Sequence, residues 1–122
     1  MTPGPWATLQ GQIVQDRARY NWTATHADEA SVLARADGRG EAYADVLDRM
    51  DFLLRLPIVP LADAWTELHA YVKEQRGIYD EQAAEHGELT GHEAQEGRAY
   101  GRVEAYDEVL AYMDSAEKEA DR

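Results

Sequence analysis

Hydrophobic residues recur at intervals of three and four along most of this chain, which is the spacing that places residues on one face of an α-helix. The most regular series lies between residues 27 and 56 and consists of Leu33, Ala36, Gly40, Tyr43, Leu47, Met50 and Leu54. Alternation of three and four is typical of helices that pack lengthwise against each other. The series therefore predicts a long amphipathic helix with a continuous packing seam.

Two further series predict helices in the second half of the chain. Pro57 and Pro60 end one helix and begin the next, and Ile58 and Val59 are expected to pack as a short linker. The helix that follows has an apolar face made of Leu61, Trp65, Leu68, Val72 and Tyr79. The last helix has a similar face made of Ala99, Val103, Tyr106, Leu110 and Met113.

The pattern at the start of the chain fits two secondary structures. Trp6, Leu9 and Ile13 share a helical face, whereas alternate residues from 9 to 13 also fit a strand. We favour a helix over residues 6–20, preceded by an irregular segment at residues 1–5. Residues 21–26 are predicted to form a turn, in which Thr23 or Thr25 accepts a hydrogen bond from a free amide of the next helix.

The best-marked boundary is the start of the last helix. Thr90-Gly-His-Glu93 has the spelling of a capping box, in which each side chain satisfies a backbone amide that the helix leaves free. This helix is expected to fray near Lys118 and to leave an acidic tail at residues 119–122.

Two glycines interrupt the first long series. Gly38 and Gly40 either break the helix or let a neighbouring helix approach closely, because glycine inside a helix costs up to about 1 kcal/mol relative to alanine. Since Gly40 lies on the seam, we favour one continuous helix with Gly40 at a close approach.

A segment of the chain occurs twice. Residues 35–51 recur at residues 98–114, a separation of 63, with most positions identical. Outside this segment the two halves hardly match. The repeat favours two duplicated αα-hairpins, the alternative being convergence between alanine-rich helices. We therefore predict a single all-α domain over residues 1–122, built as an antiparallel bundle of three or four helices.

Composition narrows the classes of function. The chain has 122 residues, no cysteine, and 24 acidic against 12 basic residues, for a net charge of −12. The excess is concentrated in residues 61–122. Acidity on this scale repels phosphate backbones and anionic membranes, so we expect no direct nucleic-acid or membrane binding. No run approaches the ~20 apolar residues of a membrane span, and we expect a cytoplasmic protein.

Catalytic motifs are missing. The serines are Ser31 and Ser115, and neither lies in a Gly-x-Ser-x-Gly sequence. Gly38-Arg-Gly40 lies within a helical pattern and is not a phosphate-binding loop. We assign no catalytic residue and no cofactor, and the chain is more typical of a non-enzymatic protein.

Carboxylates and histidines near the last helix suggest a metal site. Glu93-x-x-Glu96 and Glu104-x-x-Asp107 are similar to the spellings with which all-helical nucleotide pyrophosphohydrolases hold magnesium, but those enzymes place them on two facing helices. Here both lie on one predicted helix. His92 and Glu96, one turn apart, could reach a common ion. We assign no metal, and the candidates are His92, Glu93, Glu96, Glu104 and Asp107.

The repeated carboxylates are the candidate binding surface. Heptad phase places them on the outer face of both repeated helices, beside Arg39 and Arg102. They would form an acidic ridge that meets a basic partner. This predicted outer ridge consists of Glu41, Asp45 and Asp48 in the first copy and of Glu104 and Glu108 in the second.

These features favour a small acidic interaction protein that covers a basic surface of a nucleic-acid-handling protein. In size and charge the chain is similar to the small acidic inhibitors, some of them DNA mimics, that phages and mobile elements encode. One alternative is a magnesium-dependent nucleotide pyrophosphohydrolase. The other is a homo-oligomeric scaffold, for example a homodimer, that uses the heptad seams. Trp6, Trp22 and Trp65 are expected to pack inside the bundle, the alternative being burial in a partner's pocket.

Overall fold

The protein is an all-α bundle. The computed structural model describes residues 1–56 and 58–120, and within these residues the chain forms four α-helices. They are α1 (Pro3–His26), α2 (Ala30–Leu54), α3 (Leu61–Gly87) and α4 (Glu93–Ala120). The prediction of a helical bundle is confirmed, and residues 6–20 are helical.

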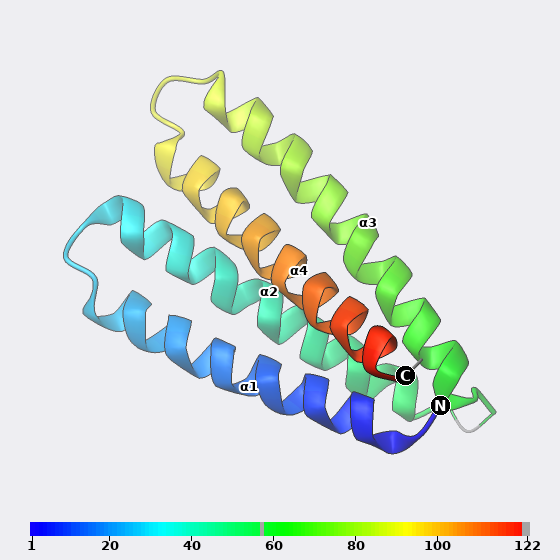
Figure 1. Ribbon diagram of the computed structural model, residues 1–122. Helices are drawn as coiled ribbons and strands as arrows, with labels where there is room; N and C mark the ends of the chain where they lie inside the picture. The colour runs from blue at the N-terminus through cyan, green and yellow to red at the C-terminus, as the bar shows by residue number, and fades with distance from the viewer. Residues whose placement is uncertain (57, 121–122) are drawn as a thin grey trace.

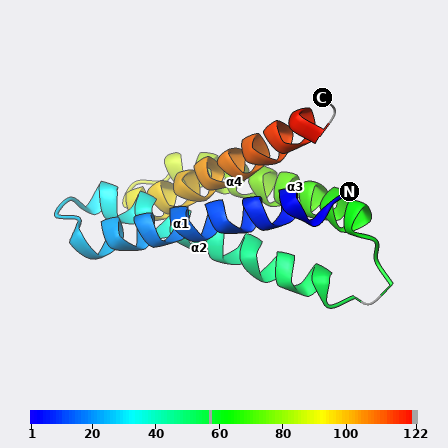
Figure 2. The ribbon, with the colours of Figure 1, turned by 60° about the horizontal axis from the view of Figure 1, so that its bottom comes forward.

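The four helices follow one another up and down the bundle (Figure 1). As a result α2 and α4 run in the same direction, and they pack against each other along the middle of the molecule. The two remaining helices are outermost, with α1 packed on α2 and α3 packed on α4. Figure 2 shows that the α2–α3 connection lies at the end of the bundle where α1 begins and α4 ends.

The core lies along the predicted seams. Trp65, Leu68 and Val72 of α3 are buried, as are Tyr43 and Met50 of α2 and the equivalent residues of α4. The prediction is wrong at both ends of the first seam, because Leu33 and Leu54 are 38% and 51% exposed while Leu53 is buried. A helix has 3.6 residues per turn, so a seam with a period of 3.5 rotates by about 20° per heptad away from a fixed neighbour.

The first helix is longer than predicted at both ends. It begins at Pro3, within the segment expected to be irregular, because proline suits a first helical position that needs no amide donor. It also continues through residues 21–26, which were predicted to be a turn. The hydroxyl groups of Thr23 and Thr25 donate to carbonyl oxygens four residues earlier in the same helix, at 3.0 and 2.9 Å, and cap nothing downstream.

Two predictions about the connections on either side of α3 need correction. The capping box at Thr90 is wrong, because α4 begins only at Glu93, after a turn at Gly91 with a φ of 88°. In the α2–α3 connection Ile58 is 90% exposed and does not pack, whereas Val59 packs against the core as expected. Pro60 immediately precedes α3 as expected, whereas Pro57 lies outside the described residues.

The end of α4 also differs from the sequence-based expectation. The helix does not fray near Lys118 but continues to Ala120. The predicted acidic tail therefore starts inside a helix, and its last two residues, 121 and 122, lie outside the described part of the chain.

The match between the two hairpins extends beyond the repeated segments. The repeated segments occupy equivalent places in α2 and α4. In addition, α1 and α3 correspond at a separation of 59, with core pairs Trp6 and Trp65, Leu9 and Leu68, Ile13 and Val72, and Tyr20 and Tyr79. The second hairpin contains four extra residues, two at the end of α3 and two in the connection to α4, so a comparison at the single separation of 63 misses this match. The expectation that the halves hardly match elsewhere is wrong.

The direct contact between α2 and α4 depends on glycine. A Cβ atom built on Gly38 would overlap the carbonyl oxygen of Arg98, and one on Gly101 would overlap the carbonyl oxygen of Arg35. The chain is continuous and helical through Gly38 and Gly40, as predicted. Gly40, however, faces the Asn21 side chain of α1, so the close approach of α2 and α4 involves Gly38 and not Gly40.

The glycine contact predicts a large effect of one added methyl group. Gly38→Ala or Gly101→Ala should lower the free energy of unfolding by at least about 2 kcal/mol, because the new Cβ meets backbone that cannot rotate away. Gly77→Ala is the matched control, since a Cβ at this exposed position in α3 meets nothing within 4 Å. It should raise stability by about 0.5–1 kcal/mol. Urea denaturation measures all three, and equal effects would contradict the assignment.

Candidate functional site

Arg39 of α2 reaches across to α4 beside the line along which the two helices pack, here called the α2–α4 groove. Its guanidinium donates to Glu104 and to Glu108, each at 3.0 Å, and to the Tyr43 hydroxyl at 3.4 Å. The same guanidinium lies over the ring of Tyr20, 4.2 Å from its centroid. This side chain is 12% exposed, so both ion pairs are partly shielded from water.

Arg102 of α4 makes the reciprocal contacts with α2. It donates twice to one oxygen of Glu41, at 2.7 and 3.2 Å, and to the Tyr106 hydroxyl at 3.3 Å. Its guanidinium lies 4.4 Å from the centroid of the Tyr79 ring. Each repeat therefore supplies the arginine that the other repeat's glutamate binds.

The predicted outer ridge is wrong for most of its members. Glu41, Glu104 and Glu108 are half-buried and pair with arginines across the α2–α4 groove. The helices approach so closely at Gly38 and Gly101 that long side chains from the flanks of each helix reach the other. The heptad position of a residue shows how far around the helix it lies from one packing seam. It does not show that a second helix also packs beside that seam.

Asp45 breaks the symmetry of the two repeats. It occupies the place of Glu108 but is one methylene shorter, and it pairs with no arginine in the described residues. Instead it accepts hydrogen bonds from the hydroxyl groups of Tyr71, at 2.7 Å, and Tyr106, at 2.9 Å. Of the predicted outer ridge, Asp48 alone is exposed.

Asp16 is a buried acid that sequence analysis missed. It is 9% exposed and accepts a hydrogen bond from the Tyr112 hydroxyl at 2.8 Å. The signal was present, because Asp16 lies on the same helical face as Trp6, Leu9 and Ile13. Its contact joins α1 to α4. The same Tyr112 hydroxyl lies 3.4 Å from Glu108, the partner of Arg39.

Burial makes the tyrosines that bond to these charged side chains weaker acids than a free tyrosine. Burial raises the pKa of Tyr43 to about 12, although Arg39 lowers it in part. Burial and the hydrogen bond to Asp45 raise the pKa of Tyr71 to about 12, and burial with the Asp45 charge raises the pKa of Tyr106 further. Tyrosinate formation is therefore easier in the unfolded chain than in the folded one.

This difference predicts alkaline destabilisation. A folded-state pKa above the ordinary value of 10.0 contributes stability that is complete below pH 10 and is lost as pH rises toward 12. Tyr43 and Tyr106 should each steepen the loss by up to about 1.4 kcal/mol per pH unit. Urea titrations between pH 9 and 12 measure the slope, and Tyr106→Phe should flatten it. A constant free energy of unfolding over this interval would contradict the prediction.

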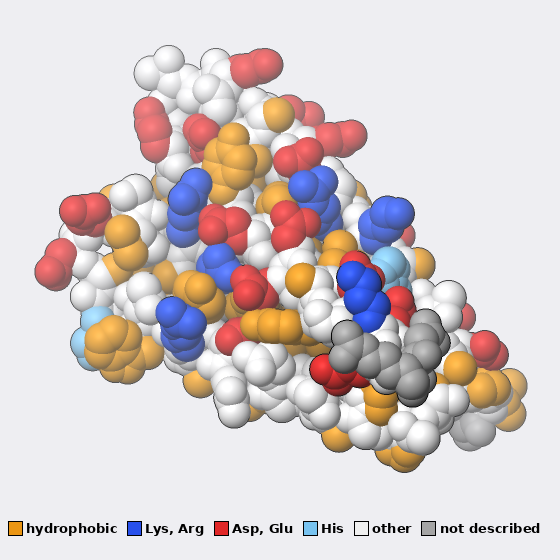
Figure 3. All heavy atoms as spheres, viewed as in Figure 1, with side chains coloured by type: hydrophobic (Ala, Val, Ile, Leu, Met, Phe, Trp, Pro, Cys, Tyr) orange, Lys and Arg blue, Asp and Glu red, His pale blue; other side chains and the backbone are white. Residues whose placement is uncertain are grey.

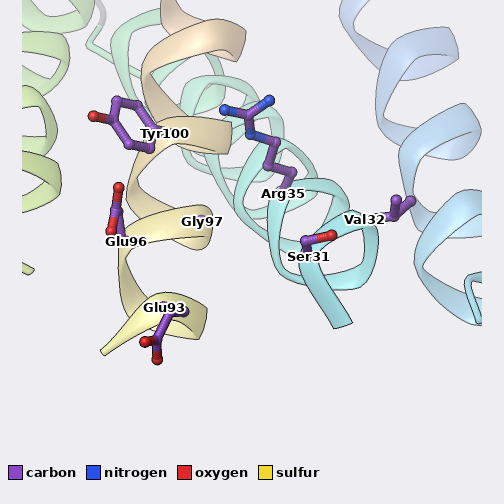
Figure 4. A pocket seen from close by; sticks show the side chains of 7 residues that line it. All are labelled: Ser31, Val32, Arg35, Glu93, Glu96, Gly97 and Tyr100. Atoms are coloured by element: carbon purple, nitrogen blue, oxygen red, sulfur yellow. The ribbon is translucent and has the colours of Figure 1, made fainter. Parts of the chain in front are cut away.

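The four carboxylates of the hydrolase alternative do not converge. Glu104 faces Arg39, and Asp107 accepts a hydrogen bond from Arg76 at 2.9 Å. Glu93 and Glu96 instead line a cavity of about 390 Å³ between the first turns of α2 and α4, shared with Arg35 (Figure 4). In the described residues, no group of three or more histidine or acidic side chains is arranged to hold a metal ion.

Unpaired acids gather on the outer face of α3. They lie at intervals of four, seven, seven and four, so they fall within about 40° of one another around the helix. All are exposed, and none forms an ion pair within the described part of the chain. Lys73 and Arg76 project on the flank of α3. We call this set the α3 stripe: Asp63, Glu67, Glu74, Glu81 and Glu85.

The equivalent face of α1 carries no charge. Gly4, Thr8, Gln15, Trp22 and His26 occupy the positions of the α3 stripe, at the separation of 59. Figure 3 shows acidic and basic side chains interleaved across the middle of one face, whereas acidic side chains without basic neighbours gather at the α3–α4 end. The two hairpins thus share a core and differ at their surfaces.

Trp6 and Trp65 are buried, as predicted, and Trp22 is not. Trp22 is 63% exposed and stacks on His26 with ring centroids 4.1 Å apart. Trp65 donates a hydrogen bond to Glu117 at 2.8 Å.

Comparisons of the chain with protein-family models, with curated proteins and with solved structures give no significant match. None of the helices in the described residues combines the length and the apolar character that crossing a membrane requires.

Proposed function

We propose that this protein is a non-enzymatic binding module whose α3 stripe docks on a basic surface of a nucleic-acid-handling protein and inhibits it by occupying that surface. The α3 stripe is the observation that carries the proposal. Its carboxylates extend over 23 residues of one helix, a rise of about 33 Å that is comparable with one turn of duplex DNA.

The distribution of arginine supports an acidic docking surface. Internal ion pairs with carboxylates of α2 and α4 involve Arg35, Arg39, Arg76, Arg98 and Arg102. These pairs neutralise positive charge within the α2–α4 groove and along its flanks. The negative charge that remains outward on α3 is therefore available to steer a basic partner.

A basic groove that binds phosphates is the best match for this surface. Such grooves carry rows of lysine and arginine that neutralise regularly spaced negative charges. A rigid helix presents its carboxylates without the entropy cost of ordering a flexible acidic segment. Because binding of this kind is mainly electrostatic, it should weaken steeply with salt.

Neutralising the stripe tests the proposal. The native protein, immobilised, should retain from a host lysate a DNA- or RNA-binding protein that duplex DNA displaces and that high salt releases. Glu67→Gln/Glu74→Gln/Glu81→Gln should lower this retention at least tenfold. Asp28→Asn/Asp48→Asn/Asp51→Asn is the matched control, because it removes the same charge from exposed positions outside α3.

Two outcomes would contradict the proposal. If both triple variants lose retention equally, net charge and not the α3 stripe determines binding. If DNA does not compete with the native protein for the retained partner, the partner's nucleic-acid groove is not the surface that is covered.

The hydrolase alternative has little geometric support. Its carboxylates face arginines or lie at separate places, and magnesium requires several oxygen ligands that converge. We expect no magnesium-dependent hydrolysis of nucleoside triphosphates. Turnover that Glu104→Gln abolishes would overturn our assignment.

The scaffold alternative would need a surface other than the heptad seams, because these are packed inside one chain. The uncharged outer face of α1 is the surface that remains for a homodimer. A solution mass equal to a single chain at micromolar concentration would remove this alternative.

A further inference from the structure

Two histidine rings meet at the tip of the second hairpin. The Nδ1 atom of His86, in the last turn of α3, lies 3.0 Å from the Nδ1 atom of His92, directly before α4. Both residues are half-buried, and their ring centroids are 5.2 Å apart. Neither histidine has an equivalent in the first hairpin, where Ala27 and Glu29 occupy these places.

The backbone of the loop holds the two rings together. The amide of Leu89 donates to the carbonyl oxygen of His86 at 3.1 Å, and the amide of His92 donates to the carbonyl oxygen of Leu89 at 3.4 Å. The amide of Glu96 then donates to the carbonyl oxygen of His92 at 2.9 Å, which starts α4. The pair is therefore positioned by hydrogen bonds that do not involve the imidazole rings.

We propose that His86 and His92 bind a divalent transition-metal ion through their Nδ1 atoms, with water at the remaining positions. Imidazole nitrogen binds such ions at about 2.0–2.1 Å. With the two Nδ1 atoms 3.0 Å apart, an ion at this distance from both would have an N–metal–N angle of about 94°. This is close to the angle between adjacent ligands in an octahedral or square arrangement. Nickel and copper adopt these geometries, and the tetrahedral angle of zinc needs only a slight separation of the rings.

Neighbouring carboxylates favour a cation at this place. The Glu96 carboxylate lies over Gly87, the residue next to His86, where a Cβ atom would be 3.4 Å from it. Glu88 and Glu93 flank the loop and are exposed. Their negative charge raises the local concentration of cations, while the two imidazoles select soft or borderline ions over magnesium.

Calorimetric titration with nickel chloride tests the site. The native protein should bind one nickel ion per chain at pH 7.5, and magnesium chloride at the same ionic strength should not compete. His86→Ala and His92→Ala should each weaken binding at least tenfold. His26→Ala and His69→Ala are the matched controls and should change it less than twofold.

Ring nitrogen NMR of the native protein gives a second test that needs no variant. Addition of zinc chloride should shift the Nδ1 resonances of His86 and His92 and leave those of His26 and His69 in place. The proposal is overturned if nickel binding is absent, if magnesium displaces it, or if the controls lose it equally. Unshifted resonances would show a hydrogen-bonded histidine pair only and would also overturn it.

Discussion

The contact of the α2 and α4 backbones at Gly38 and Gly101 is the constraint on which the rest of the structure depends. Because neither glycine has a side chain, the two helices approach until the flanks of each face the other. Arg39 and Arg102 then cross the groove in opposite directions, and each meets a glutamate of the other repeat. Glycine is unfavourable within an isolated helix, so its cost in helix stability is offset by packing and by shielded ion pairs.

The duplicated core and the unequal surfaces follow from this arrangement. The α2–α4 contact is shared by both hairpins, and the core positions of the two halves match. The outer helices α1 and α3 lie on opposite sides of the α2–α4 pair and barely touch, so little contact between them constrains their outward residues. Charge therefore differs there, with an acidic face on α3 and an uncharged face on α1. Surface differences between otherwise equivalent hairpins are where a specific function would arise.

The spacing of hydrophobic residues predicted the helices and the middle of each seam, because each helical turn places one residue in the core. The prediction failed for hydrogen bonds within one helix and for contacts between the sides of two helices. The threonines of residues 21–26 resemble a turn, yet their hydroxyl groups can bond within a helix. Most acids of the predicted outer ridge face the other repeated helix, which heptad position alone does not reveal. The signal that could have found them is the Arg-x-Glu spacing in both repeats, which allows each arginine to pair with the other copy's glutamate.

The loop of the second hairpin links its two special features. His86 follows Glu85, the last acid of the α3 stripe, so a metal ion on the histidine pair would add positive charge at that end of the stripe. The ion and a basic partner would then disfavour each other, and by linkage each would lower the affinity of the other by the same factor. Screening limits this coupling to a Debye length of about 8–10 Å, so it would involve Glu85 more than the distant Asp63. The first hairpin has neither the acids nor the histidines, which leaves this coupling confined to one half of the duplicated fold.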